Sequence, residues 1–157
     1  MKEHRQILYL VRGLPGSGKS TIAKNIVAKS AEKSIQVMHY EGDDFHTYVQ
    51  RVVGHEVEQS YNFNVKLVGA AHDLCYGRTM RALSEGHDAV VANTFTTKRE
   101  LGRYISGVER SELPVDIIVL KATGDFKTIH NVPDAVISRM RDRWEDYTKE
   151  TEVTSDG

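Results

Sequence analysis

The sequence contains a single cysteine, no long apolar run and no excess of basic residues. Because Cys75 stands alone, the chain can form neither an internal disulfide nor a zinc site built on several cysteines. No apolar run approaches the roughly 20 residues that a membrane-spanning helix needs, and the first residues lack the apolar core of a signal peptide. These absences predict a protein that stays in the cytoplasm and has no membrane partner.

The formal net charge of −1 bears on the partners that the protein can have. Proteins that grip a long stretch of nucleic acid usually carry a basic surplus, because neutralised phosphates supply much of the affinity. If this chain acts on a polynucleotide, we therefore expect a local basic cluster to hold only its end.

Strands and helices are predicted to alternate along the chain. With 157 residues, of which 39% are hydrophobic and 27% charged, the sequence has the size and composition of one folded domain. Buried strands are predicted at 7–11, 35–40, 89–92 and 115–120, and helices at about 19–33, 65–85, 98–109 and 134–147. This alternation is typical of an α/β protein with a parallel sheet of four to five strands, flanked by helices on both faces. We assign the single domain to residues 1–147 and predict a flexible tail at 148–157.

A glycine-rich loop joins the first predicted strand to the first helix and fits the phosphate-binding pattern G-x-x-x-x-G-K-[ST]. Its glycines allow successive backbone N–H groups to point at phosphate oxygens, and the positive end of the helix adds to the attraction. Lys19 is placed to reach the β- and γ-phosphates, and the Ser20 hydroxyl to bind Mg²⁺. The alternative is a glycine-rich turn with a chance Lys-Ser pair, but strand, spacing and helix all agree. The predicted nucleotide-binding residues are Gly13, Gly16, Ser17, Gly18, Lys19, Ser20 and Thr21.

Two carboxylates, Asp43 and Asp44, follow the second predicted strand at the edge where open α/β sheets bind their ligands. Asp43 is predicted to orient an acceptor hydroxyl and take its proton, and it could also contact the metal. The alternative is a helix cap, and one aspartate could serve each role. The third predicted strand has no acidic residue at its end, which argues against a motor-type ATPase. The predicted substrate-binding residues are Asp44, His46, Asn93, Thr94 and Lys127.

Positive charge for a transition state is predicted near the last helix. Arg139 and Arg143 lie four residues apart on one face of that helix, and Lys127 lies in the loop before it. We predict that the two arginines are catalytic. The alternative is a solvated surface on which they pair with Asp142 and Glu145.

Two further patterns are predicted to be structural. The apolar stripe of the last helix is expected to face the core, and it consists of Val136, Ile137, Met140 and Trp144. His72 is expected to be a packed or partly exposed histidine, because nothing near it completes a metal site.

Four motifs, in this order, resemble the P-loop kinase family that includes the 5′-kinase domain of bacteriophage polynucleotide kinase. The motifs are Gly13 to Thr21, Asp43 to Phe45, Val90 to Thr94, and His130 to Pro133 followed by Ile137 to Met140. The resemblance covers about residues 7–147 and implies the P-loop kinase fold. It also implies an enzyme that uses ATP and Mg²⁺ and transfers the γ-phosphate to the 5′-hydroxyl of DNA or RNA.

The resemblance implies that Lys19 and Ser20 bind the phosphates and the metal, and that Asp43 is the base. Three departures concern the acceptor. The phage enzyme has an arginine where this chain has His46, and many members have an asparagine where this chain has Phe95. The loop before the last helix is short and carries Lys127 and His130 in place of the lid arginine of the phage enzyme. A nucleoside, nucleotide or other small hydroxyl compound is therefore an alternative acceptor, which the near-neutral charge favours. A further alternative is a nucleotide-binding regulatory module with little turnover.

Overall fold

A parallel five-stranded sheet forms the centre of the computed structural model, which describes residues 4–42, 65–126 and 134–154. The strand order is β2-β3-β1-β4-β5, and every neighbouring pair is parallel. The strands are β1 (Gln6–Arg12), β2 (Val37–Glu41), β3 (Asp88–Ala92), β4 (Val115–Ala122) and β5 (Glu150–Val153). The helices within the described ranges are α1 (Lys19–Glu32), α3 (Val65–Ser84), α4 (Lys98–Ser111) and α5 (Asp134–Asp142).

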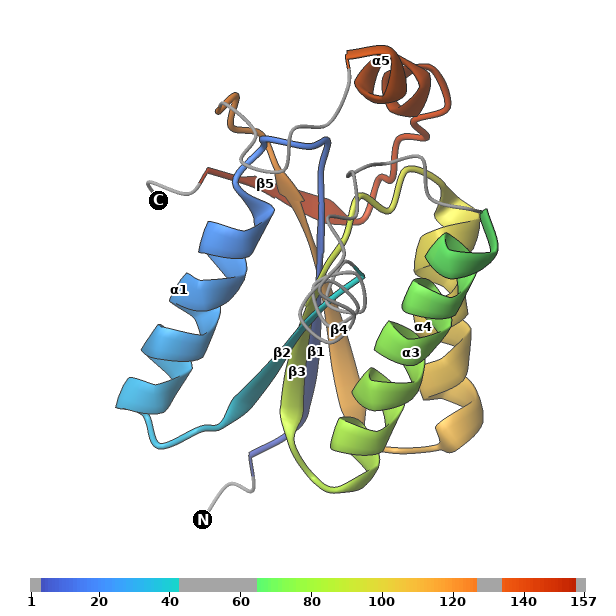
Figure 1. The fold of residues 1–157 in the computed structure, drawn as a ribbon. Coiled ribbons are helices and arrows are strands. Elements are labelled where there is room, and N and C mark those ends of the chain that lie inside the picture. Colours follow the sequence, from blue (N-terminus) through green and yellow to red (C-terminus); the bar gives the residue numbers. More distant parts are fainter. Residues whose placement is uncertain (1–3, 43–64, 127–133, 155–157) are drawn as a thin grey trace, which may run out of the picture.

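Helices cover both faces of the sheet, with α1 on one face and α3 and α4 on the other (Figure 1). Successive residues of a strand point to opposite faces, so β1 contributes to two cores. Leu8 and Leu10 pack toward α3 and α4, whereas Val11 packs with Ile22 and Ala23 of α1. This burial on both faces explains the nearly continuous apolar run of β1.

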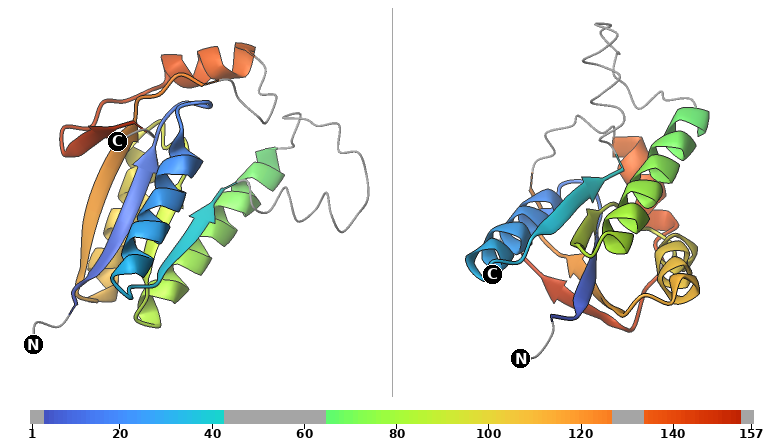
Figure 2. Two further views of the ribbon diagram at one scale, coloured as in Figure 1. Left: turned by 90° about the vertical axis from the view of Figure 1, so that its left-hand side faces the viewer. Right: turned by 90° about the horizontal axis from the view of Figure 1, so that it is seen from below.

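The carboxyl ends of all five strands lie at one edge of the sheet, because the strands are parallel. Two backbone hydrogen bonds join the ends of β1 and β3 there: Asn93 N–H donates to the Val11 carbonyl at 3.1 Å, and Gly13 N–H donates to the Thr94 carbonyl at 3.2 Å. Helix α5 lies across this same edge (Figure 2, left). The loops that follow the strands are therefore gathered on one side of the molecule.

The predicted fold class is confirmed, and several element ends fall where local signals put them. Helix α3 ends at Ser84, and Gly86 follows with a φ of 90°, a left-handed conformation that glycine adopts without strain. Thr97 and Glu100 form a capping box at the start of α4. Each of the helices within the described ranges is too short or too polar to cross a membrane.

Two predictions about the end of the chain are wrong. Residues 150–153 were expected in a flexible tail, but they form β5 and pair with β4 from Val119 to Ala122. Helix α5 ends at Asp142, not at 147, and it contributes no buried residue. The apolar stripe of this helix is therefore not part of the core, and Trp144 lies beyond the helix, against the guanidinium of Arg12.

Candidate phosphate and metal site

The glycine-rich loop between β1 and α1 has the backbone that its sequence predicts. Gly16 and Gly18 have φ angles of 82° and 95°, which other residues rarely adopt. At Gly13 the constraint is space: a Cβ would lie 2.3 Å from Ser17 Oγ and 3.1 Å from the Ala122 carbonyl oxygen. These glycines are therefore needed for the shape of the loop, as the phosphate-binding pattern requires.

The loop is held from one side by the segment that follows β4. Gly124 N–H donates to the Ser17 carbonyl at 3.1 Å, and Phe126 N–H donates to the Gly16 carbonyl at 2.6 Å. The Ser17 hydroxyl is buried and has no hydrogen-bond partner in the described part of the chain. A buried hydroxyl without a hydrogen-bond partner destabilises the folded protein. An anion bound in the loop could accept a hydrogen bond from this hydroxyl.

Lys19 lies at the first turn of α1, with its ammonium close to the loop. Its Nζ donates a hydrogen bond to the Leu14 carbonyl at 2.9 Å. The side chain is half-buried, and Thr21, two residues further along the helix, is exposed. The ammonium of the predicted phosphate-binding lysine thus lies beside the phosphate loop.

Sequence reasoning missed the partner of Ser20. The Ser20 hydroxyl donates to Oε1 of Glu41, the last residue of β2, and His39 Nε2 lies 3.8 Å from the same oxygen. A hydroxyl and a carboxylate are oxygen ligands of the kind that Mg²⁺ prefers, so this pair fits the metal predicted for the loop. Glu41 could have been found from sequence, because it ends a parallel strand at the ligand-binding edge, like Asp43 two residues later.

Asn93 connects the ends of β2 and β3. The Gly42 N–H donates to Asn93 Oδ1, and Asn93 Nδ2 lies 4.0 Å from Cys75 Sγ, which also accepts from the Tyr104 hydroxyl at 3.5 Å. Burial, and then the neighbouring Cys75, raise the pKa of Tyr104 well above its usual value. Asn93 is buried, so this amide holds the chain that leads out of β2; its contact with a substrate stays a prediction.

Gly42 is enclosed by two side chains. A Cβ at Gly42 would lie 2.7 Å from Asn93 Oδ1 and 3.1 Å from two atoms of the His72 ring. His72 is half-buried, which agrees with the packed histidine that the sequence predicts. Thr94 is also half-buried and lies at the same edge, where its carbonyl accepts from Gly13.

The two predicted arginines have different surroundings. Arg143 Nε donates to Thr96 Oγ1 at 3.1 Å, and the next residues continue this attachment, since Glu145 N–H donates to the Thr96 carbonyl at 2.7 Å. Arg143 therefore attaches the chain after α5 to Thr96. Arg139 has an exposed side chain on the helix itself.

A buried arginine, Arg12, lies directly before the loop and was not predicted. Its side chain is 0% exposed. It donates twice to the Phe95 carbonyl, at 3.0 and 2.8 Å, and once to the Glu145 carbonyl at 2.8 Å. It also pairs with Glu150 at 3.1 Å and stacks on Trp144 at 4.0 Å. Arg12 thus joins the ends of β1 and β3 to the segment that leads into β5.

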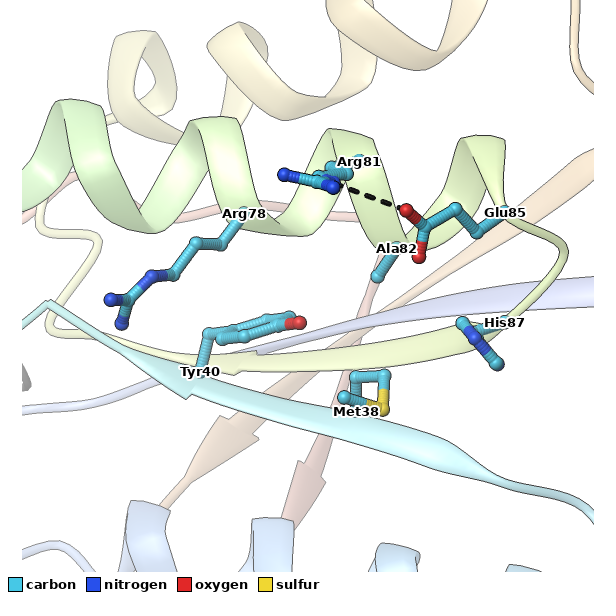
Figure 3. A pocket seen from close by; sticks show the side chains of 7 residues that line it. All are labelled: Met38, Tyr40, Arg78, Arg81, Ala82, Glu85 and His87. Atoms are coloured by element: carbon cyan, nitrogen blue, oxygen red, sulfur yellow. Dashed lines mark hydrogen bonds and ion pairs between the residues drawn. The ribbon is translucent and has the colours of Figure 1, made fainter.

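A separate pocket of about 250 Å³ lies between β2 and the second half of α3 (Figure 3). Met38 and Tyr40 line it from the strand and Arg78 from the helix, and burial raises the pKa of Tyr40. Arg81 is paired with Glu85 across one turn at 3.1 Å. No residue of the phosphate loop lines this pocket, so we assign the nucleotide to the loop and not to this space.

Several predicted site residues lie outside the described part of the chain: Asp43, Asp44, His46 and Lys127. Within the described residues, no cluster of three or more histidine, cysteine or acidic side chains could hold a metal. Among the described residues, Ser20 and Glu41 are the paired oxygen donors beside the phosphate loop that could hold Mg²⁺.

The strand, loop and helix, with Lys19 and Ser20 at the carboxyl edge of a parallel sheet, define a P-loop nucleotide-binding domain with a kinase-type fold. Residues 8–126 match a family model described as an AAA domain. Because this match includes more than half of the chain, the protein belongs to that family.

Solved structures share the fold at low sequence identity. Mycobacterium tuberculosis APS kinase CysC in complex with AMPPNP and APS is 14% identical, with a TM-score of 0.63 over 99% of this chain and 91% of that chain. Chaetomium thermophilum Kti12 in complex with ADP-AlF3 is 17% identical, with a TM-score of 0.67 over 94% and 88%. A chain of the Pnkp1/Rnl/Hen1 complex is 17% identical, with a TM-score of 0.58; the match covers 96% of this chain but 44% of that one. These likenesses establish the fold.

Proposed function

We propose that this protein is an ATP- and Mg²⁺-dependent kinase whose acceptor is the 5′-hydroxyl at an end of DNA or RNA. One observation supports the reaction class above all: the Ser20 hydroxyl of the phosphate loop is paired with the Glu41 carboxylate at the end of β2. This pair places oxygen ligands for a divalent cation beside the loop that would hold the phosphates. The acceptor is inferred from the ordered motifs that resemble the polynucleotide kinase family.

In the proposed reaction, the acceptor oxygen forms a bond to the γ-phosphorus while the bond from that phosphorus to the β,γ-bridging oxygen breaks and ADP leaves. The Asp43 carboxylate takes the proton of the hydroxyl. Lys19 and the loop amides bind the phosphate oxygens, and Arg139 brings positive charge to the transition state. When bound by Ser20 and Glu41, Mg²⁺ would neutralise charge on the β- and γ-phosphates.

A small hydroxyl compound is the second candidate acceptor, and the net charge of −1 favours it. The two acceptors differ in their response to salt. A polynucleotide end held through its phosphates should show a KM that rises markedly with salt concentration, whereas a neutral nucleoside should not.

The test is transfer of labelled γ-phosphate from ATP to a panel of 5′-hydroxyl DNA and RNA oligomers, nucleosides and nucleoside monophosphates. Lys19→Ala should abolish transfer, and Lys24→Ala, which changes an exposed lysine of the same helix, should not. Asp43→Asn should lower kcat about 100- to 10,000-fold while ATP still binds. Glu41→Gln should shift the dependence of the rate to higher Mg²⁺ concentration.

Each outcome selects one function. Label on an oligomer end supports the polynucleotide acceptor, and label on small compounds alone replaces the acceptor but keeps the kinase. Binding of ATP without transfer to any acceptor would contradict the kinase and favour a regulatory module. An Asp43→Asn variant with unchanged kcat would contradict the assigned base.

A further inference from the structure

Phe126 is a large exposed aromatic residue beside the phosphate loop. Its side chain is 47% exposed, and the other exposed large apolar residues in the described ranges, Leu74 and Ile118, are 36% and 37% exposed. Leu74 lies in α3 and Ile118 in the middle of β4, away from the loop. Phe126 is the one attached to it, through the bond from its N–H to the Gly16 carbonyl.

The ring of Phe126 occupies space that is open because residue 124 is a glycine. A Cβ at Gly124 would lie 2.3 Å from Phe126 Cε2 and 2.7 Å from the Ser17 carbonyl oxygen. The ring therefore lies over Gly124, within the same small space as the backbone of the phosphate loop. Two backbone hydrogen bonds, from Gly124 N–H and Phe126 N–H, hold the segment that carries this ring against the loop.

An exposed aromatic ring at this position suits a flat apolar ligand. Leaving such a ring in water forgoes the burial of apolar surface, and aromatic rings stack well on nucleobases because every base has a π-face. The loop beside it is built to bind the phosphates of a nucleotide. In a nucleotide only the ribose separates the base from the phosphates, so a ring beside this loop is within reach of the base.

We propose that Phe126 is the stacking platform for a nucleobase. The inference rests on the proposed function and extends it, since it names a residue that recognises the base and not the phosphates. The base could belong to the ATP donor or to the terminal nucleotide of the acceptor. In both cases the ligand chemistry is a nucleobase, and binding measurements separate the two sources.

The test compares ATP with inorganic tripolyphosphate, which carries the phosphates without a base, in calorimetric titrations with Mg²⁺. If the base of ATP stacks on Phe126, Phe126→Ala should weaken ATP binding about 5- to 150-fold and leave tripolyphosphate binding unchanged. Phe126→Trp should retain the affinity for ATP. Ile118→Ala, a matched exposed apolar residue on another part of the surface, should change neither affinity.

If the base of the acceptor stacks there, ATP binding should stay unchanged in Phe126→Ala and the KM for a 5′-hydroxyl oligomer should rise by a similar factor. The inference is overturned if neither quantity changes by more than about twofold. It is also overturned if ATP and tripolyphosphate lose affinity equally, because the variant would then have altered the loop. If the wild-type protein binds neither ATP nor tripolyphosphate, the proposed function fails as well. If the wild-type protein binds both and Phe126→Ala changes nothing, only the stacking inference fails.

Discussion

The pair between Arg12 and Glu150 allows a quantitative prediction of stability. Arg12 is 0% and Glu150 9% exposed, and their side-chain atoms lie 3.1 Å apart. Removing one partner of a buried ion pair costs about 3–5 kcal/mol, because the other charge stays buried. Arg12 keeps its bonds to the Phe95 and Glu145 carbonyls, which places Glu150→Ala at the lower end, about 3 kcal/mol. Glu150→Gln keeps an oxygen acceptor without the charge and should cost about half as much.

These values translate into shifts of the melting temperature. For a chain of this length, 1 kcal/mol corresponds to about 2–4 °C, so Glu150→Ala should melt about 6–12 °C lower than the wild type. Glu152→Ala, in the same strand but exposed, is the matched control and should change little. Thermal unfolding followed by circular dichroism measures the difference. The reasoning is refuted if Glu150→Ala melts within about 1 °C of the Glu152→Ala protein.

Two more predictions concern the residues around Asn93. Asn93→Ala leaves the Gly42 N–H without its acceptor and should lower the free energy of unfolding by about 1–3 kcal/mol in urea titrations, whereas Thr94→Ala next to it should have a smaller effect. The pKa of Tyr104 is raised in the folded state, so the unfolded chain loses the tyrosine proton first. Stability should therefore be full below about pH 10 and fall as pH rises past it, and Tyr104→Phe should reduce this fall. Equal alkaline losses in the two proteins, measured by urea midpoints between about pH 9 and 11, would contradict this assignment.

The phosphate loop could be predicted because its information is local. Gly13, Gly18 and Lys19 follow one another at fixed spacing, and the adjoining strand and helix supply the context. The end of α3 could also be predicted from local sequence. The apolar residues of this helix recur with a clear period, and Gly86 follows it in a left-handed conformation. Parallel strands then place the loops at one edge, so the general location of the site also follows from sequence.

The features that were missed depend on contacts between distant parts of the chain. Strand β5 reads Glu-Thr-Glu-Val and has the composition of a tail; it becomes a strand by pairing with β4. Arg12 continues an apolar run, and its burial depends on acceptors near Phe95 and Glu145, more than 80 residues away in sequence. The apolar residues of α5 recur with a helical period, which predicted a buried face. The helix instead lies across the edge of the sheet and buries none of its residues.

The attachment of Arg12 also bears on the order in which the chain can fold. β1 is the central strand and is synthesised first, but both of its neighbours, β3 and β4, are synthesised much later. The carboxylate that pairs with Arg12 belongs to residue 150, so a nascent chain that already contains the whole phosphate loop still lacks the partner of the residue before it. Contacts of such long sequence separation slow folding. We therefore expect the nucleotide site to form only after residue 150 has left the ribosome.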